Sequence, residues 1–292
     1  VFPRTTSIVD VDLRIAGNGI EGLTFRYRFD DPLEGCQWSS WSQGKALEGL
    51  RGIEVPKPET WSPEEPHLHR LKVALMDGAE MLDCSEVRFG LRTVATKGRE
   101  ILLNGAPVKL FGFNRHELTS SAVLSYEELL RDVQLLKEVG ANFVRGAHYA
   151  QDQRFLDLCD EHGLLVWEEV LGWQNTPQDF ADGIFLMQSM KLADEMVAAS
   201  VNHPSVIFFG FFNEGRSDDP SSATENAYRS MSSRLRERSK GRLISWGSSA
   251  TVTDRYLYYA DVCAFHHYPA WYPTHVPGNM DEVKQIPLLY EA

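Results

Sequence analysis

The stretch VIFFGFFNEG, Val206 to Gly215, places a run of apolar residues directly before an asparagine and a glutamate. A strand that is apolar on both faces is typical of a parallel sheet covered by helices. Asn213 and Glu214 stand where such a strand would end. In parallel-sheet folds of the barrel type, functional groups gather at that end of the strands. The stretch therefore predicts a buried strand that delivers an amide and a carboxylate to a site.

Composition limits the class of protein. The 292 residues are 43% hydrophobic and 24% charged, which is typical of a globular protein. Lys and Arg number 29 against 41 Asp and Glu, a net charge of -12 that would repel nucleic acid and anionic membrane surfaces. No apolar stretch approaches the roughly 20 residues that span a bilayer. We expect a soluble protein, cytoplasmic or secreted, with neither nucleic acid nor a membrane as partner.

The four cysteines are far apart and form no CxxC or Cys/His cluster, so buried free thiols are expected rather than structural zinc or a disulfide framework. We predict no metal and no cofactor. The chain opens on Val1 and closes at LLYEA, from which we expect it to be a piece of a longer protein.

The chain shows two kinds of organisation. Residues 1–95 contain short alternating runs separated by turn residues, which predict a small β-sandwich; these runs are SIVDVDLRI, GLTFRYRF, HRLKVALM and EVRFGLRTV. Residues 96–292 alternate strand-like with helix-like runs, and one helix should begin at Ser125 with a capping box to Glu128. The seven expected strands include VKLFGFN (108–114), ANFVRGAHY, LLVWEEV, SVIFFGFF, RLISWGSS, VCAFHHY and PLLYE.

Seven strands with intervening helices predict an α/β fold: a (β/α)8 TIM barrel that stops after its seventh strand. A doubly wound open sheet competes with it, but no GxGxxG follows any strand. Strand after strand ends in polar groups, which a barrel would bring to one mouth; they are Asn114 to Glu117, Arg145, His148, Tyr149, Glu168, Glu169, Asn213, Glu214, His266 to Tyr268 and Glu291.

Two carboxylates form a candidate catalytic pair. Glu214 follows the fourth barrel strand and Glu291 the seventh, and the ends of these strands can face each other across a barrel mouth. Retaining glycosidases need two carboxyls about 5–5.5 Å apart, one as acid and one as nucleophile. Asn213 can hold a sugar hydroxyl, and Trp173, just after the third strand, can stack on a sugar face.

The sequence resembles glycoside hydrolase family 2, which includes β-galactosidases, β-glucuronidases and β-mannosidases. The resemblance covers nearly the whole chain; the motifs are WSPEEPHLHRLKV, FGLRTV, ILLNGAPVKLFGFNRHE, NFVRGAHY, NHPSVIFFGFFNEG and PLLYE. It implies a jelly-roll sugar-binding domain, absent here, then an immunoglobulin-like sandwich over 1–95 and a barrel over 96–292 that lacks its C-terminal end.

The resemblance also implies roles. Glu214 is expected to be the acid/base, Glu291 the nucleophile, and Tyr268 the tyrosine that hydrogen-bonds the nucleophile. The other expected substrate-binding residues are Asn213, Arg145, His148, His116, Glu169, His266, Trp271 and Trp173. The chain departs from the family pattern at His266, where many members have Asn, at Glu168-Glu169, which replaces Asp-Glu, and in the spacing between Pro287 and Glu291.

The implied activity is that of a retaining exo-β-glycosidase acting by double displacement on terminal β-galactosides or β-glucuronides. Glu214 should then have a raised pKa, for which the neighbouring phenylalanines offer apolar surroundings. The partner is a carbohydrate, and the full-length protein is a possible homo-oligomer.

Two other classes stay open. A metal-dependent barrel hydrolase would use His116, His148, His266 and His267 as ligands. A non-catalytic carbohydrate-binding fragment would bind sugar without turning it over. The sequence does not decide between the galactoside and the glucuronide.

Overall fold

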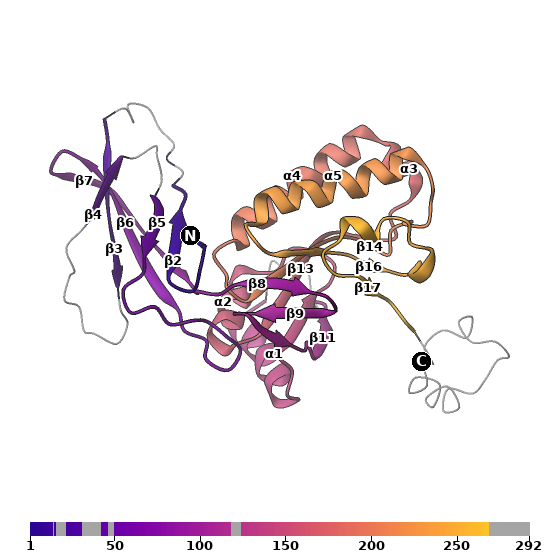
Figure 1. Ribbon diagram of the computed structural model, residues 1–292, viewed down its shortest axis with the longest axis horizontal. Helices are drawn as coiled ribbons and strands as arrows, with labels where there is room; N and C mark the ends of the chain where they lie inside the picture. Colours follow the sequence, from indigo (N-terminus) through magenta and orange to yellow (C-terminus); the bar gives the residue numbers. More distant parts are fainter. Residues whose placement is uncertain (14, 16–21, 31–41, 46–49, 118–123, 269–292) are drawn as a thin grey trace.

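The computed structural model describes residues 1–13, 15, 22–30, 42–45, 50–117 and 124–268 (Figure 1). No helix in these ranges is long and apolar enough to cross a membrane. The predicted seventh barrel strand lies outside the described residues, as do Trp271 and Glu291.

The amino-terminal part contains two antiparallel sheets. One has the order β1 (Phe2–Pro3), β2 (Ile8–Val11), β5 (Leu50–Glu54). The other has the order β4 (Ser42–Lys45), β3 (Thr24–Asp30), β6 (His69–Asp77), β7 (Glu80–Phe89). Alternate residues of β2 are buried, as the sequence pattern predicts, and Val9 and Val11 pack with Leu71 and Phe89 of the second sheet. The predicted β-sandwich is confirmed.

An antiparallel meander follows the sandwich. It comprises β8 (Val94–Lys97), β9 (Glu100–Leu103) and β10 (Ala106–Val108). The sequence interpretation was wrong here, because it placed one strand over 108–114. Asn104 and Gly105 both have positive φ and turn the chain back, so residue 108 completes the meander and a separate strand, β11 (Gly112–Arg115), starts afterwards.

The second part is built on a parallel sheet whose strands lie in chain order. These strands are β11, β12 (Phe143–Gly146), β13 (Leu165–Trp173), β14 (Val206–Asn213) and β15 (Leu243–Ser245). A second parallel pair, β16 (Gly247–Ser248) and β17 (Ala264–Phe265), continues the series. The described strands thus form part of a barrel wall.

Helices alternate with these strands and cover one face of the sheet (Figure 1). They are α1 (Tyr126–Glu138), α2 (Gln153–His162), α3 (Pro177–Ala181), α4 (Gly183–Ser200) and α5 (Ser222–Ser239), with 3-10 helices η2 (Thr251–Thr253) and η3 (Leu257–Tyr259). The predicted capping box is present: Glu128 N donates to Ser125 Oγ and Ser125 N donates to Glu128 Oε2. The segment between β16 and β17 forms the short helices η2 and η3.

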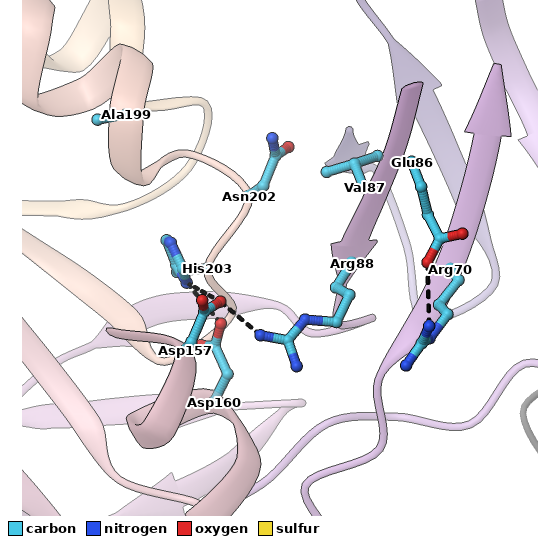
Figure 2. A pocket seen from close by; sticks show the side chains of 9 residues that line it. All are labelled: Arg70, Glu86, Val87, Arg88, Asp157, Asp160, Ala199, Asn202 and His203. Atoms are coloured by element: carbon cyan, nitrogen blue, oxygen red, sulfur yellow. Dashed lines mark hydrogen bonds and ion pairs between the residues drawn. The ribbon is translucent and has the colours of Figure 1, made fainter. Parts of the chain in front are cut away.

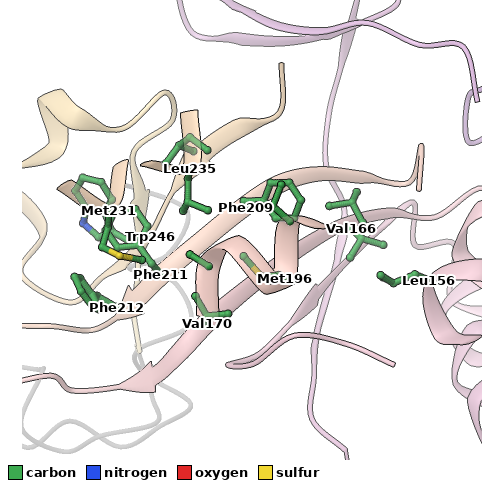
Figure 3. Close-up of a cluster of buried hydrophobic side chains, with 14 of the residues drawn as sticks. Leu156, Val166, Val170, Met196, Phe209, Phe211, Phe212, Met231, Leu235 and Trp246 are labelled. Carbon is green, nitrogen blue, oxygen red and sulfur yellow. The ribbon is translucent and has the colours of Figure 1, made fainter. Parts of the chain in front are cut away.

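Strand β14 is buried along its whole length, as its sequence predicts. Phe209 and Phe211 pack with Met196 of α4 and Met231 of α5 between the sheet and its helices (Figure 3). Phe208 belongs to a second cluster, in which it stacks on Trp167 at a centroid distance of 5.2 Å. The two clusters lie on opposite faces of the sheet. One packs the sheet against its helices, and the other fills the inner side of the barrel wall.

The sandwich contacts the amino-terminal end of the sheet. Trp61 Nε1 donates to the Asp160 carbonyl at 2.8 Å. Buried Arg92 donates at 2.8 Å to the carbonyl of Pro204, two residues before β14, and at 2.7 Å to that of Val206, the first residue of β14. These contacts leave the carboxyl ends of the strands clear of the sandwich.

Candidate active site

The carboxyl ends of four strands bring most of the predicted site residues together. Arg145 comes from β12, Glu169 from β13, Asn213 from the last position of β14, and His266 from the position after β17. Hydrogen bonds link these four side chains directly. Residues that are far apart in the sequence therefore form one polar cluster at one end of the sheet.

Arg145 is the centre of this cluster. Its guanidinium binds the Glu169 carboxylate with Nε–Oε2 and Nη2–Oε1 distances of 3.1 and 3.0 Å. Nη2 also donates to Asn213 Oδ1 at 2.6 Å, and Nη1 lies 2.9 Å from Nε2 of His266. The guanidinium carbon lies 4.9 Å from the ring centroid of Trp167, which supports it from below. Paired with a buried carboxylate, the charge of Arg145 serves to hold its neighbours in place.

The backbone at the end of β14 turns sharply. Phe212 and Glu214 have φ values of 48° and 51°, a left-handed conformation that is costly for residues other than glycine. The Glu214 amide donates to the Gly247 carbonyl at 2.8 Å, which ties the turn to β16. Strain of this kind is typical of functional sites, and here it directs the Glu214 side chain toward β17.

The Glu214 carboxyl is largely buried, with 15% of its side chain exposed. Its Oε1 atom lies 2.6 Å from Nδ1 of His266 and also accepts a hydrogen bond from the Tyr268 hydroxyl. The nucleophile with which Tyr268 was expected to bond, Glu291, lies outside the described residues, so this expectation is not tested.

The expected raised pKa of Glu214 is wrong for this structure. Burial of the carboxyl acts most strongly, in the raising direction, but the hydrogen bonds from Tyr268 and His266 favour the carboxylate, and the net effect lowers the pKa below 4.5.

A second group of rings lies beside Glu169. His148 Nδ1 lies 2.5 Å from Glu169 Oε1. The His148 ring lies 5.3 Å from His116 and 6.0 Å from Trp173, centroid to centroid. Burial, His148 and Arg145 together lower the pKa of His116. Trp173 is 63% exposed at the end of β13, so its ring is available to a ligand.

Glu168, next to Glu169, points away from this site. It is fully buried and accepts a hydrogen bond from the Gln151 amide at 2.8 Å. Burial raises its pKa to about 7, against the hydrogen bonds that favour its ionised form. Successive strand residues face opposite sides of a sheet, so only one of the two glutamates can reach the mouth.

The sequence interpretation missed two glycines that make room for the cluster. A Cβ atom on Gly247 would lie 2.4 Å from His266 Nε2 and 2.7 Å from Asn213 Oδ1. A Cβ on Gly210 would lie 2.2 Å from Nε1 of Trp167, the ring beneath Arg145. Neither contact has a sequence signature, because the partners come from other strands.

The four histidines of the metal alternative do not form a metal group. Both ring nitrogens of His266 face other side chains, and His148 Nδ1 faces a carboxylate. Within the described ranges, the group spaced for a metal ion is Asp157, Asp160 and His203, next to the sandwich.

Two family models match the chain. The model described as Glycosyl hydrolases family 2 matches residues 5–92, and that described as Glycosyl hydrolases family 2, TIM barrel domain, matches residues 94–287. The second match covers more than half of the chain, so the fold is that of a TIM-barrel hydrolase domain preceded by a sandwich. The chain belongs to glycosyl hydrolase family 2.

Curated relatives are longer than this chain. A β-galactosidase from Thermoanaerobacter pseudethanolicus is 36% identical over 174 residues, which is 58% of this chain and 23% of that protein. A putative β-glucuronidase from Formosa agariphila is 36% identical over 163 residues, 55% of this chain and 19% of that protein. The chain thus matches less than a quarter of the length of these relatives.

Solved structures cover more of the chain. A GH2 β-galacturonidase from Eisenbergiella tayi, bound to galacturonate, has a TM-score of 0.74 and 28% identity over 99% of this chain and 49% of that chain. A β-D-glucuronidase from Dictyoglomus thermophilum has a TM-score of 0.74 and 26% identity over 91% of this chain and 47% of that chain.

Proposed function

We propose that the protein is a retaining exo-β-glycosidase that hydrolyses terminal β-glycosides by double displacement. The observation that carries the proposal is the position of Glu214. This carboxylate stands at the carboxyl end of a central parallel strand, beside Asn213, within a cluster organised by Arg145. Membership of glycosyl hydrolase family 2 supports the same reaction class.

The lowered pKa of Glu214 makes its protonated form the minor one near neutral pH, and it is this form that acts in the first step: it gives its proton to the leaving oxygen while Glu291, the proposed nucleophile, attacks the anomeric carbon. Water then attacks the glycosyl-enzyme, and Glu214 takes a proton from that water. Asn213 accepts from Arg145 Nη2, and its amide nitrogen, which donates to no residue that the structure describes, is proposed to bind a sugar hydroxyl. His148, held by Glu169, and His116 are proposed to bind further hydroxyls, with Trp173 and Trp271 as stacking surfaces.

The proposed substrates are β-galactosides and β-glucuronides. The named relatives include a β-galactosidase and a putative β-glucuronidase, and one similar structure is a β-galacturonidase. Arg145 is engaged by Glu169, so it is not the proposed contact for a uronate carboxylate. We further propose that the chain is part of a longer protein whose remaining segments complete the barrel and the sugar site.

The proposal is tested in the intact full-length protein with a panel of aryl β-glycosides. We expect turnover of at least one, and we expect Glu214→Gln to lower kcat/KM by about 100-fold or more, because removal of a general acid/base typically costs 10²–10⁴-fold. The matched control is Glu195→Gln, an exposed carboxylate on α4. Near-normal activity of Glu214→Gln on a glycoside with a poor leaving group would show that Glu214 is not the acid/base.

The open alternatives give different results in the same assay. Activity that disappears with EDTA and returns with a divalent ion would favour the metal-dependent class. Saturable sugar binding with no turnover of any glycoside by the intact protein would favour the carbohydrate-binding fragment.

A further inference from the structure

His266 connects the general acid/base candidate to Arg145. Its ring has partners at both nitrogens: Nδ1 lies 2.6 Å from Glu214 Oε1 and 3.1 Å from the Tyr268 hydroxyl, and Nε2 lies 2.9 Å from Arg145 Nη1. The side chain is 16% exposed, so water does not compete freely for either contact. One residue after β17 thus joins the ends of β12 and β14.

The two contacts together determine the proton on the ring. An arginine guanidinium has only donors, so Nε2 of His266 must accept from Arg145 and carries no proton. The ring proton is then on Nδ1, which donates it to Glu214. An imidazolium would place an N–H against a guanidinium, which is unfavourable. Burial, the largest effect, and the charge of Arg145 both lower the pKa of His266, in agreement with a neutral ring.

The groups around this pair come from several elements. Arg145 of β12 and Glu169 of β13 face His266, and Tyr268 and His148 face Glu214. The charge of Glu169 is satisfied by Arg145 and His148. Arg145 therefore fixes Nε2 of His266 as an acceptor, and Glu214 faces the Nδ1 that carries the proton.

The two oxygens of Glu214 have different surroundings. Oε1 accepts from both His266 Nδ1 and the Tyr268 hydroxyl, whereas Oε2 accepts no hydrogen bond from any residue that the structure describes. We propose that His266 is a positioning residue, held by Arg145 as the neutral Nδ1–H tautomer, which binds Oε1 of Glu214 and leaves Oε2 to carry the acid proton. This inference rests on the proposed function, in which Glu214 is the acid/base.

The arrangement acts on the first step of the reaction. The proton on Oε2 passes to the leaving oxygen, which keeps the electron pair of the broken bond to the anomeric carbon. The nucleophilic carboxylate forms the new bond to that carbon. Negative charge therefore appears on Glu214 as the proton leaves, and the Nδ1–H and Tyr268 donors already point at it. Donors fixed where charge develops stabilise a transition state without reorganisation.

The first test does not depend on turnover. Ring-¹⁵N-labelled histidine in the intact protein, with the His266 signals assigned by their absence in His266→Asn, reports which nitrogen carries the proton at pH 7. We expect the neutral form with Nδ1 protonated. A signal of the Nε2–H tautomer or of an imidazolium would overturn the proposal, even if the protein proves to be an active glycosidase.

The second test uses two substitutions, each of which places an amide group where one of the two imidazole nitrogens lies. The amide nitrogen of Asn occupies the place of Nδ1, so His266→Asn can still donate to Glu214. The amide of Gln occupies the place of Nε2, so His266→Gln can still meet Arg145 but not Glu214. We expect His266→Gln to lower kcat/KM for an alkyl β-glycoside about 10- to 100-fold, the typical value of a hydrogen bond to a charged group.

The pH profile distinguishes positioning from a merely structural role. Losing the Nδ1–H donor disfavours the carboxylate and so raises the pKa of Glu214. Glu214 must be protonated for the first step, so the basic limb of kcat/KM moves to higher pH in His266→Gln and stays in place in His266→Asn. The control is His162→Gln, an exposed histidine at the end of α2.

A third test compares substrates with different leaving groups, because only a poor leaving group needs the acid proton of Glu214. A dinitrophenyl β-glycoside needs no acid, so His266→Gln should turn it over at close to the rate of the unmodified protein. Equal losses with both leaving groups, or equal shifts of the basic limb in the Asn and Gln variants, would overturn the proposal. If no glycoside is turned over at all, the proposed function fails, and the NMR result alone decides whether the tautomer is correct.

Discussion

Arg145 and Glu169 form the ion pair on which the candidate site is built. Both side chains are buried, at 7% and 1% exposure, and the pair also holds Asn213, His148 and His266. A pattern of polar residues at strand ends was enough to single out all five. Their mutual distances follow from the parallel order of β12, β13 and β14, which the sequence pattern indicates but does not measure.

Removing one member of this pair should cost more than removing both. We expect Arg145→Gln or Glu169→Gln alone to lower the free energy of unfolding by about 3–5 kcal/mol, because each leaves an uncompensated buried charge. The double variant should lose clearly less than the sum of the two. Denaturant unfolding of the four proteins measures this coupling. Strictly additive losses would show that the two charges do not compensate each other.

At the element scale, the short strand β16 decides how closely the ends of β14 and β17 can approach. Gly247 lies between Asn213 and His266, and its missing side chain is what allows both to reach Arg145. The sequence interpretation placed a strand over RLISWGSS, but did not distinguish β15 from β16 or single out this glycine. A contact between three strands cannot be recognised from the local pattern of any one of them.

We expect Gly247→Ala to lower kcat/KM at least tenfold while the protein stays folded, because a methyl group 2.4 Å from His266 Nε2 must displace the ring from Arg145 and Glu214. A 1 Å misplacement of a catalytic group can cost about 100-fold. Kinetics with an aryl glycoside and circular dichroism provide the measurement. Gly183→Ala, at a glycine with no heavy atom within 4 Å of the added Cβ, is the control and should be neutral. Unchanged kinetics in Gly247→Ala would contradict this packing.

At the scale of the whole molecule, strands β6 and β7 of the sandwich meet α2 and the end of α4 at a cavity of about 510 Å³ with charged walls (Figure 2). Arg88 of β7 binds Asp157 and Glu161 of α2, and His203, just before β14, lies 2.6 Å from Asp160. His203 Nε2 also lies 3.2 Å from Gln153 Oε1. Two acceptors around one ring favour the imidazolium, so this junction is sensitive to pH.

Burial disfavours charge on His203, but the hydrogen bond to Asp160 and the surrounding carboxylates outweigh it and raise its pKa above 6.5. A group whose pKa is raised by folding stabilises the fold fully below its unfolded pKa, and this stabilisation is lost as pH rises through the folded pKa. We expect the free energy of unfolding to fall as pH rises above about 6.5, and His203→Gln to flatten that slope.

Denaturant unfolding at several pH values measures the effect of His203. The pKa of Glu168 is also raised, to about 7, so its titration lowers the free energy of unfolding as pH rises. The comparison is therefore made in a Glu168→Gln background. A slope above pH 7 that is unchanged by His203→Gln would rule out His203 as its source.

The sequence alone determined the classes of structure in this protein. Alternation of period two produced the sandwich, and continuous apolar runs such as Val206–Asn213 produced the buried parallel strands, because burial of apolar surface acts residue by residue. Only the tertiary structure decided the state of Glu214. Its pKa depends on donors from residues 52 and 54 positions away, and no local pattern contains their distance or direction. The apolar neighbours in the sequence predicted a protonated acid, but the neighbours in space favour a carboxylate.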